Sequence, residues 1–187
     1  PFLRSYELAL DKSSIVIKSD RKGNITYTNE YFNNISGFKS EEIIGNSLDI
    51  LKHSDNSNEI YIELLKTIND KKVWKGILKN SGKTDDFWVD TTILPILDKN
   101  ENIVEFISAG YDITRIINQQ EQLDKIAKTD ILTGLGNRYK LIHDISYSLN
   151  PALAVINIDN FSQSNDFYGY EVGDNIIKEI GLNIFNL

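Results

Sequence analysis

Few side chains in this sequence could act as nucleophiles or as metal ligands. The chain has 187 residues, with no Cys and only two His, His53 and His143. The absence of Cys excludes a thiolate nucleophile, a thiolate metal site, a disulfide scaffold and a cysteinyl cofactor adduct. Neither His stands in a partner motif, which disfavours a haem ligand, and His53 is interpreted as a solvated loop residue. Any chemistry is therefore expected from amides, carboxylates and aromatic rings.

A set of polar side chains surrounds the end of an apolar segment late in the chain. Residues Ala152–Asp159 form a nearly continuous apolar run, which is typical of a strand buried on both faces. Asn157 and Asp159 are two residues apart and would share one face of that strand. Asn165 and Asp174 follow. Taken alone, they are interpreted as a turn residue and a helix cap, because these are common roles of loop Asn and Asp.

Composition limits the classes of function. The chain is 41% hydrophobic with a net charge of −7, which suits a packed core and not a disordered chain. The acidic balance disfavours a nucleic-acid partner, which needs a basic face. No apolar run approaches about 18 residues, so no membrane span is expected. Because Met and a signal peptide are both absent, we expect a piece of a longer, cytoplasmic protein.

Strand and helix signals alternate in the first 112 residues. Two β-branched runs, Ser14–Ser19 and Ile25–Asn29, flank a turn at Asp20–Asn24 and predict a hairpin. After short helical pieces, helical spacing predicts a longer helix over Asn58–Lys71. Three further strands are then expected, Val73–Lys79, Asp86–Leu97 and Ile103–Asp112. This order predicts an antiparallel sheet with helices packed on one face.

A helix over Arg115–Lys128, with Thr114 as its N-cap, is predicted to follow the sheet. Ile116, Leu123 and Ala127 lie near a coiled-coil seam. Pairing with a second copy of the chain is one interpretation of this seam, and an ordinary surface linker is the other.

The pattern changes after Asp130. Helices are predicted over Asn137–Leu149 and Val172–Leu187, on either side of the strand expected at Ala152–Asp159. This α-β-α order indicates the beginning of a second, α/β domain.

Short motifs occur in a fixed order along the first part of the chain. They are Gly23–Asn29, Phe32, Gly37-Phe38, Glu42–Gly45, Trp74–Gly76, Asp98–Ile103 and Asp112–Thr114. In this order they resemble the PAS sensory domain family. The resemblance implies an α+β fold in which a five-stranded antiparallel sheet carries helices on one face, often around a ligand. It implies a sensory domain at residues 1–114 and a signalling helix at 115–129.

Three segments of this region have a further likeness, Lys52–Asp55, Trp74–Asn80 and Phe87–Val89. They resemble the flavin-binding subset of PAS domains, as in aerotaxis receptors and the flavin regulator of nitrogen fixation. The resemblance implies non-covalent FAD in a slot with aromatic walls and amide groups. The residues expected to bind it are Trp74, Asn80, Trp88, Asn29 and His53. The alternative is that both Trp pack in the core and Asn29 caps a helix.

Another set of motifs lies at residues 130–187. Asp130–Arg138 is followed by Asn157–Phe161, Asn165-Asp166, Gly169 and Gly173-Asp174. These motifs resemble the N-terminal part of the GGDEF family of diguanylate cyclases. That family has an α/β fold of the palm or ferredoxin-like type and joins two GTP molecules into cyclic di-GMP with the help of metal ions. The signature hairpin is absent from this sequence, so no catalytic residue is expected in it.

In this second resemblance, the position expected to bind metal departs from the family, whereas the positions expected to bind the guanine base are retained. Asn157, followed by Ile158, occupies the position of a metal-binding carboxylate, and Asn offers no charge to a hard cation. Two further family positions also differ, at Ser162 and Tyr170. Asn165 and Asp174 keep the amide and carboxylate that suit a guanine edge. The resemblance therefore implies a degenerate domain that binds a guanine nucleotide, with GTP and Mg²⁺ used only by a complete domain.

Together the resemblances predict a bacterial signal-transduction protein, in which a PAS sensor acts through a helix on a degenerate, regulatory GGDEF domain of cyclic di-GMP signalling. The expected partners are a small-molecule ligand or redox cofactor and a second copy of the chain, paired through the linker helix. The alternatives are an active diguanylate cyclase or a GGDEF–EAL phosphodiesterase at full length, or a dimerisation module with an empty PAS core.

Overall fold

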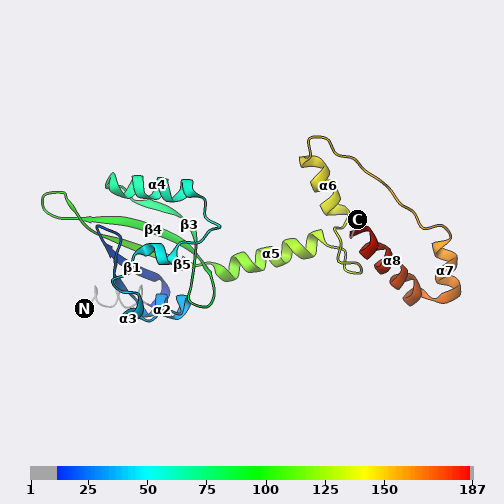
Figure 1. Ribbon diagram of the computed structural model, residues 1–187, viewed down its shortest axis with the longest axis horizontal. Helices are drawn as coiled ribbons and strands as arrows, with labels where there is room; N and C mark the ends of the chain where they lie inside the picture. The colour runs from blue at the N-terminus through cyan, green and yellow to red at the C-terminus, as the bar shows by residue number, and fades with distance from the viewer. Residues whose placement is uncertain (1–11, 186–187) are drawn as a thin grey trace. The chain divides into compact units, whose positions relative to one another are not determined.

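The computed structural model describes residues 12–185, whose helices and strands are drawn in Figure 1. The chain divides into two compact units, residues 1–117 and 118–187. No helix within residues 12–185 is long and apolar enough to cross a membrane. The expectations of a missing signal peptide and of a sensory domain that begins at residue 1 concern residues 1–11, outside the described part.

A five-stranded antiparallel sheet in the order β2-β1-β5-β4-β3 forms the first unit. The predicted hairpin is present as β1 (Ile15–Asp20) and β2 (Ile25–Thr28). The other strands are β3 (Trp74–Asn80), β4 (Phe87–Leu97) and β5 (Ile103–Asp112). Strand β5 is paired with both β1 and β4, so the hairpin joins the later strands in one sheet. The predicted antiparallel sheet is confirmed.

The helices of this unit pack on the sheet face that carries the alternating apolar residues. They are α2 (Glu30–Ser36), α3 (Ser40–Ile43), the 3₁₀ helix η1 (Leu48–Leu51) and α4 (Asn58–Asn69). In β4, Val89 is buried and Asp90 is exposed, as the period-two pattern predicts. Leu64 and Ile68 of α4 pack against Trp74, Leu78 and Phe106 of the sheet. The core therefore lies between this face and the helices.

Helix α5 (Thr114–Lys128) follows β5, as predicted. The side chain of Thr114 does not cap it in the expected way. Its hydroxyl accepts a hydrogen bond from the backbone N–H of Trp88 at 2.8 Å and donates one to the carboxylate of Asp112. The start of α5 is thus fastened to the sheet.

The second unit contains α6 (Arg138–Tyr147), α7 (Phe161–Tyr168) and α8 (Tyr170–Phe185). The Asp130–Asn137 motif forms the turn before α6. The carboxylate of Asp130 accepts hydrogen bonds from the backbone N–H and the hydroxyl of Thr133 at 2.9 and 2.7 Å. Asn137 caps α6 and donates to the carbonyl of Ala127 near the end of α5. The motif therefore joins two helices in a fixed turn.

The strand predicted at Ala152–Asp159 is wrong. These residues are irregular and mostly exposed, with Val155 at 85% exposure. A β-strand needs a neighbour to pair its N–H and C=O groups. None of the described residues from 129 to 185 forms a strand that could provide one, so the apolar run lies unpaired. Helix α7, which the sequence analysis did not predict, follows this run.

Candidate functional site

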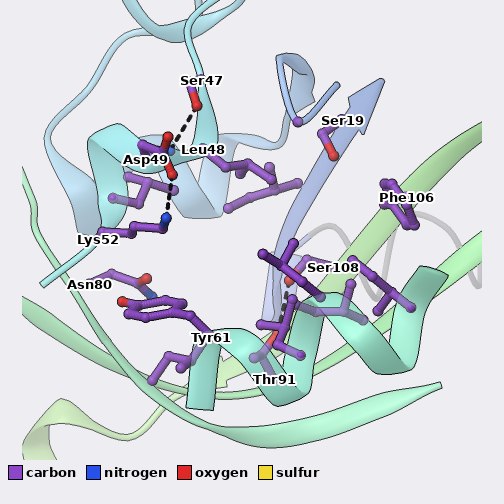
Figure 2. A pocket seen from close by; sticks show the side chains of 18 of the residues that line it. Ser19, Ser47, Leu48, Asp49, Lys52, Tyr61, Asn80, Thr91, Phe106 and Ser108 are labelled. Atoms are coloured by element: carbon purple, nitrogen blue, oxygen red, sulfur yellow. Dashed lines mark hydrogen bonds and ion pairs between the residues drawn. The ribbon is translucent and has the colours of Figure 1, made fainter. Parts of the chain in front are cut away.

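A cavity of about 410 Å³ lies between the inner face of the sheet and helices η1 and α4 (Figure 2). Apolar side chains make most of its wall. They come from β1, η1, α4, β3, β4 and β5 and include Ile15, Ile17, Leu48, Leu51, Leu64, Ile68, Leu78, Val89, Ile93 and Phe106. This volume and this kind of wall are typical of a site for a small molecule.

Polar groups stand at separate points on the apolar wall. On the sheet, the hydroxyls of Thr91 and Ser108 lie 2.9 Å apart and are bonded to each other. Asn80, at the end of β3, also lines the cavity. No group within residues 12–185 forms a hydrogen bond with its side-chain amide. Figure 2 shows Asn80 with Tyr61 and Lys52 on one side of the cavity, and Thr91 with Ser108 on another. The free amide can therefore donate to and accept from a ligand.

Charged residues also line the cavity. They are Arg21, Lys22, Asp49 and Lys52. Nζ of Lys52 lies 2.6 Å from Oδ1 of Asp49 and 5.2 Å from the centre of the Tyr61 ring. The hydrogen bond from Lys52 lowers the pKa of the Asp49 carboxyl below its ordinary value. Arg21 and Lys22 have no carboxylate within ion-pair distance among the described residues.

The turn that carries Arg21 and Lys22 is held in place by hydrogen bonds. Oδ1 of Asp20 accepts from the backbone N–H of Lys22 at 2.8 Å and of Asn24 at 2.9 Å. Gly23 adopts a φ of 84°, which favours glycine, and its carbonyl accepts from Leu48 N–H at 2.9 Å. The turn is therefore fastened to η1 at the edge of the cavity.

Asn29 and Trp74, two of the predicted cofactor-binding residues, lie outside the cavity lining. Asn29 is 2% exposed, and its Oδ1 accepts from the N–H groups of Val16 and Phe32, both at 3.0 Å. Its Nδ2 donates to the Ser14 carbonyl at 2.7 Å. Trp74 is 3% exposed within the core. The two side chains occupy the positions that the alternative interpretation, a helix cap and core packing, assigns to them.

Trp88 and His53 also lie outside the cavity lining. Trp88 is half-buried, at an alternate position from the buried Phe87 and Val89, and Nζ of Lys79 lies 5.8 Å from its ring. Nε2 of His53 lies 2.9 Å from Oδ2 of Asp86. His53 lies in a loop, as expected, but its side chain is only 15% exposed, so it is partly buried and not fully solvated. Asn80 is therefore the member of the predicted set that lines the cavity.

Comparison with known proteins identifies the first unit. Residues 12–115, more than half of the chain, match the PAS domain family. The chain belongs to this family. Residues 127–186 match the family described as diguanylate cyclase, GGDEF domain, so a GGDEF region follows the PAS domain.

Relatives and a solved structure share these regions. The chain is 26% identical over 193 residues to the cyclic di-GMP phosphodiesterase PdeR of Escherichia coli (strain K12), covering 96% of this chain and 28% of the relative. It is 34% identical over 122 residues to a blue-light photoreceptor of Listeria innocua serovar 6a, covering 63% of this chain and 48% of the relative. It thus spans less than half of either relative.

The PAS fold is also found in a solved structure described as "Flavin Analogue Sheds Light on Light-Oxygen-Voltage Domain Mechanism". The TM-score is 0.53 at 16% identity, and the match covers 66% of this chain and 95% of that one. At 16% identity, this match shows a shared fold alone.

Several residues of the PAS cavity are missed by the sequence analysis. Thr91 and Ser108 stand on inward strand positions that are otherwise apolar, and this break in an apolar pattern is the signal that could have found them. Arg21 and Lys22 carry no such signal, because charged turn residues are common and their approach to η1 depends on long-range hydrogen bonds.

In the GGDEF region, Asn157 and Ile158 lie in the irregular segment before α7. The described residues contain no group of three or more His, Cys, Asp or Glu that could hold a metal ion. Asn157 would supply one neutral amide oxygen, whereas Mg²⁺ prefers carboxylates. Asn157 therefore offers a neutral oxygen and no charge at the position where the resemblance implies a metal-binding carboxylate.

The two residues expected at a guanine edge belong to neighbouring helices. Asn165 lies on α7, and Asp174 lies on α8 next to Gly173. A Cβ at position 173 would overlap Oδ1 of Asn165, so the absence of a side chain there makes room for the amide. Oδ1 of Asn165 is buried and has no partner among the described residues, while Asp174 is exposed.

Proposed function

We propose that the PAS domain is a sensor that binds a flavin, FAD in the first instance, without a covalent bond. The observation that carries this proposal is the cavity of about 410 Å³ with the unbonded amide of Asn80 at its wall. Apolar and aromatic walls suit an isoalloxazine ring, and an amide suits its pyrimidine edge. The resemblance to flavin-binding PAS domains and the fold shared with a light-oxygen-voltage domain support the same cofactor.

A bound flavin would supply electron-transfer chemistry, and the residues of this chain would position it. Asn80 would hold the edge of the ring, while Thr91 and Ser108 would present hydroxyls from the sheet. The chain has no Cys, so a light-driven cysteinyl adduct is excluded. We therefore propose that the domain senses redox state or the presence of the cofactor, and does not signal through adduct formation.

The sheet offers a direct route from the cavity to α5. Val89 and Thr91 line the cavity on β4, and Trp88 on the same strand bonds to the start of the helix. Trp88 donates its N–H to Thr114 at 2.8 Å and accepts from Ile113 N–H at 2.9 Å. A shift of β4 caused by the ligand would therefore reach α5 through two hydrogen bonds.

Helix α5 is proposed to pair with the same helix of a second chain. Of the predicted seam residues, Ile116 and Leu123 are 64% and 62% exposed and Ala127 is also exposed, and the neighbouring Ile126 is 68% exposed. Burial of exposed apolar residues at near-heptad spacing favours pairing. In the longer protein, such a dimer would bring two GGDEF regions under the control of the sensor.

The GGDEF region is proposed to be a regulatory copy that binds a guanine nucleotide through Asn165 and Asp174 and does not make cyclic di-GMP. The support is the position of Asn157, which offers no charge to Mg²⁺. Incubation of the full-length protein with GTP and Mg²⁺ tests this assignment. We expect no cyclic di-GMP, and its formation would establish the alternative, an active cyclase.

Flavin reconstitution tests the sensor assignment. The 187-residue chain is incubated with FAD, freed of unbound flavin by gel filtration, and examined by visible absorbance. We expect a yellow protein with close to one flavin per chain. Asn80→Leu should lower this amount of bound flavin, and Asn100→Leu, at an exposed turn, should leave it unchanged. A colourless chain would rule out the flavin assignment.

A further inference from the structure

The lining of the PAS cavity carries more positive than negative charge, in a chain whose net charge is −7. The ionisable Lys, Arg, Asp and Glu residues of the lining are three cations, Arg21, Lys22 and Lys52, and one anion, Asp49. The remaining lining is apolar or uncharged. A positive edge on an apolar cavity is the arrangement that suits a ligand with an apolar body and an anionic end.

The single carboxylate is already paired. Nζ of Lys52 lies 2.6 Å from Oδ1 of Asp49, so no anion of the lining is left for Arg21 and Lys22. Asp98, which interacts electrostatically with Arg21 from outside the lining, lies beyond ion-pair distance. Neither has a carboxylate within ion-pair distance among the described residues. Adjacent cations repel each other, so an anion between or beside them lowers the electrostatic energy.

The neighbouring carboxylate of Asp20 does not serve this purpose, because it is used in the turn. Its oxygens accept from the backbone N–H groups of Lys22 and Asn24 and from the side chain of Asn24, at 2.8–2.9 Å. These hydrogen bonds, with that of Asn24 first, lower the pKa of Asp20, so it stays ionised while it holds the loop. The same turn is bonded to η1 through Leu48 N–H and the Gly23 carbonyl. The two cations are thus carried on a fixed loop and not on a free tail.

We infer that Arg21 and Lys22 form the binding site for the phosphate of a phosphorylated flavin. The inference rests on the proposed flavin function and adds a specificity to it: the cavity selects flavin mononucleotide or dinucleotide over riboflavin. Arg binds phosphate through paired N–H donors and Lys binds it as a point charge. The two residues therefore determine which form of the flavin is retained.

The test compares riboflavin, FMN and FAD as probes for the 187-residue chain, with binding followed by quenching of flavin fluorescence. We expect FMN and FAD to bind at least about tenfold more tightly than riboflavin, because only they carry phosphate charge. The advantage should shrink as salt is added, since exposed charges are screened within about 10 Å at 0.1 M salt.

A charge-matched pair of variants isolates the turn. Arg21→Gln/Lys22→Gln should weaken FMN binding by roughly tenfold and leave riboflavin binding unchanged. Lys71→Gln/Lys72→Gln removes the same charge outside the cavity lining and should change neither. Equal binding of the three flavins, or equal effects of the two double variants, would overturn the phosphate site and leave the flavin function standing. Failure of all three flavins to bind would overturn both.

Discussion

Asn29 and Asn80, which the sequence analysis assigns to one cofactor, have different roles in the structure. Their replacement by alanine should therefore have different effects on stability. Asn29 is 2% exposed, and its amide serves three backbone groups: the N–H of Val16, the N–H of Phe32 and the carbonyl of Ser14. Asn80 lines the cavity, and its amide is bonded to nothing among the described residues. The first residue is therefore structural, and the second is available to a ligand.

The magnitude follows from the hydrogen bonds removed. Asn29→Ala leaves three backbone groups without their partner, and one of them, the N–H of Phe32, is the one that Asn29 caps at the start of α2. Loss of a cap costs about 1 kcal/mol, and each other buried polar group left unpaired costs about 1–3 kcal/mol. Because the Val16 bond is only partly buried, we expect a loss of about 3–5 kcal/mol in the free energy of unfolding. Asn80→Ala removes no internal hydrogen bond, so its loss should stay below about 1 kcal/mol.

Urea denaturation followed by Trp fluorescence measures both values. Trp74 and Trp88 are the chain's only Trp residues and both lie in the PAS sheet, so the signal reports on that unit alone. A loss below about 1 kcal/mol for Asn29→Ala, or equal losses for the two variants, would refute the assignment of Asn29 to the fold.

Three further outcomes are expected. Gly76→Val should destabilise the PAS domain by about 1–3 kcal/mol in the same denaturation assay, because a Cβ at this position would overlap the ring of Trp74. Hydrogen bonds from Thr133, the larger effect from its hydroxyl and the smaller from its N–H, lower the pKa of Asp130 in the folded state below the ordinary 3.8. The ionised Asp130 carboxylate therefore stabilises the folded state fully above pH 3.8, and this stabilisation is lost as the pH falls through the lower pKa of the folded state. Thr133→Val should move the acid-unfolding midpoint of the second unit, followed by amide exchange, to higher pH; an unmoved midpoint would contradict this. Leu123→Glu on exposed α5 should convert a dimer to a monomer in sedimentation, and an unchanged mass would exclude pairing through this face.

Much of the PAS fold is predictable because its signals are local. The alternation of Phe87, Val89 and Thr91 with Trp88 and Asp90 predicts which side of β4 is buried. The glycine of the first turn marks the hairpin because its φ of 84° is costly for other residues. Each of these features is encoded within a few neighbouring residues.

The apolar run at 152–159 shows where local signals fail. Its apolar composition favours a β-strand, but a strand forms only where another strand can pair with it. The second unit has no strand among its described residues, so the run stays irregular. The prediction from composition was therefore a statement about the segment alone.

The cavity depends on contacts that the sequence does not display. Thr91 and Ser108 are 17 residues apart and meet across the pairing of β4 with β5. Arg21 and Lys22 reach the cavity because the turn is bonded to η1. Both depend on long-range register, which one sequence does not reveal, whereas Asn80 was found because it stands in a motif with a family resemblance.

The central claim is that a flavin occupies the PAS cavity, and a titration of two adjacent threonine variants tests it most directly. Thr91 faces the cavity, whereas Thr92 is the next residue on the same strand and is absent from the lining. With FAD as titrant and the flavin spectrum as readout, Thr91→Leu should weaken binding at least about tenfold by filling the cavity and removing a hydroxyl. Thr92→Leu should bind like the parent chain. No binding by the parent chain, or equal affinities for both variants, would contradict the claim.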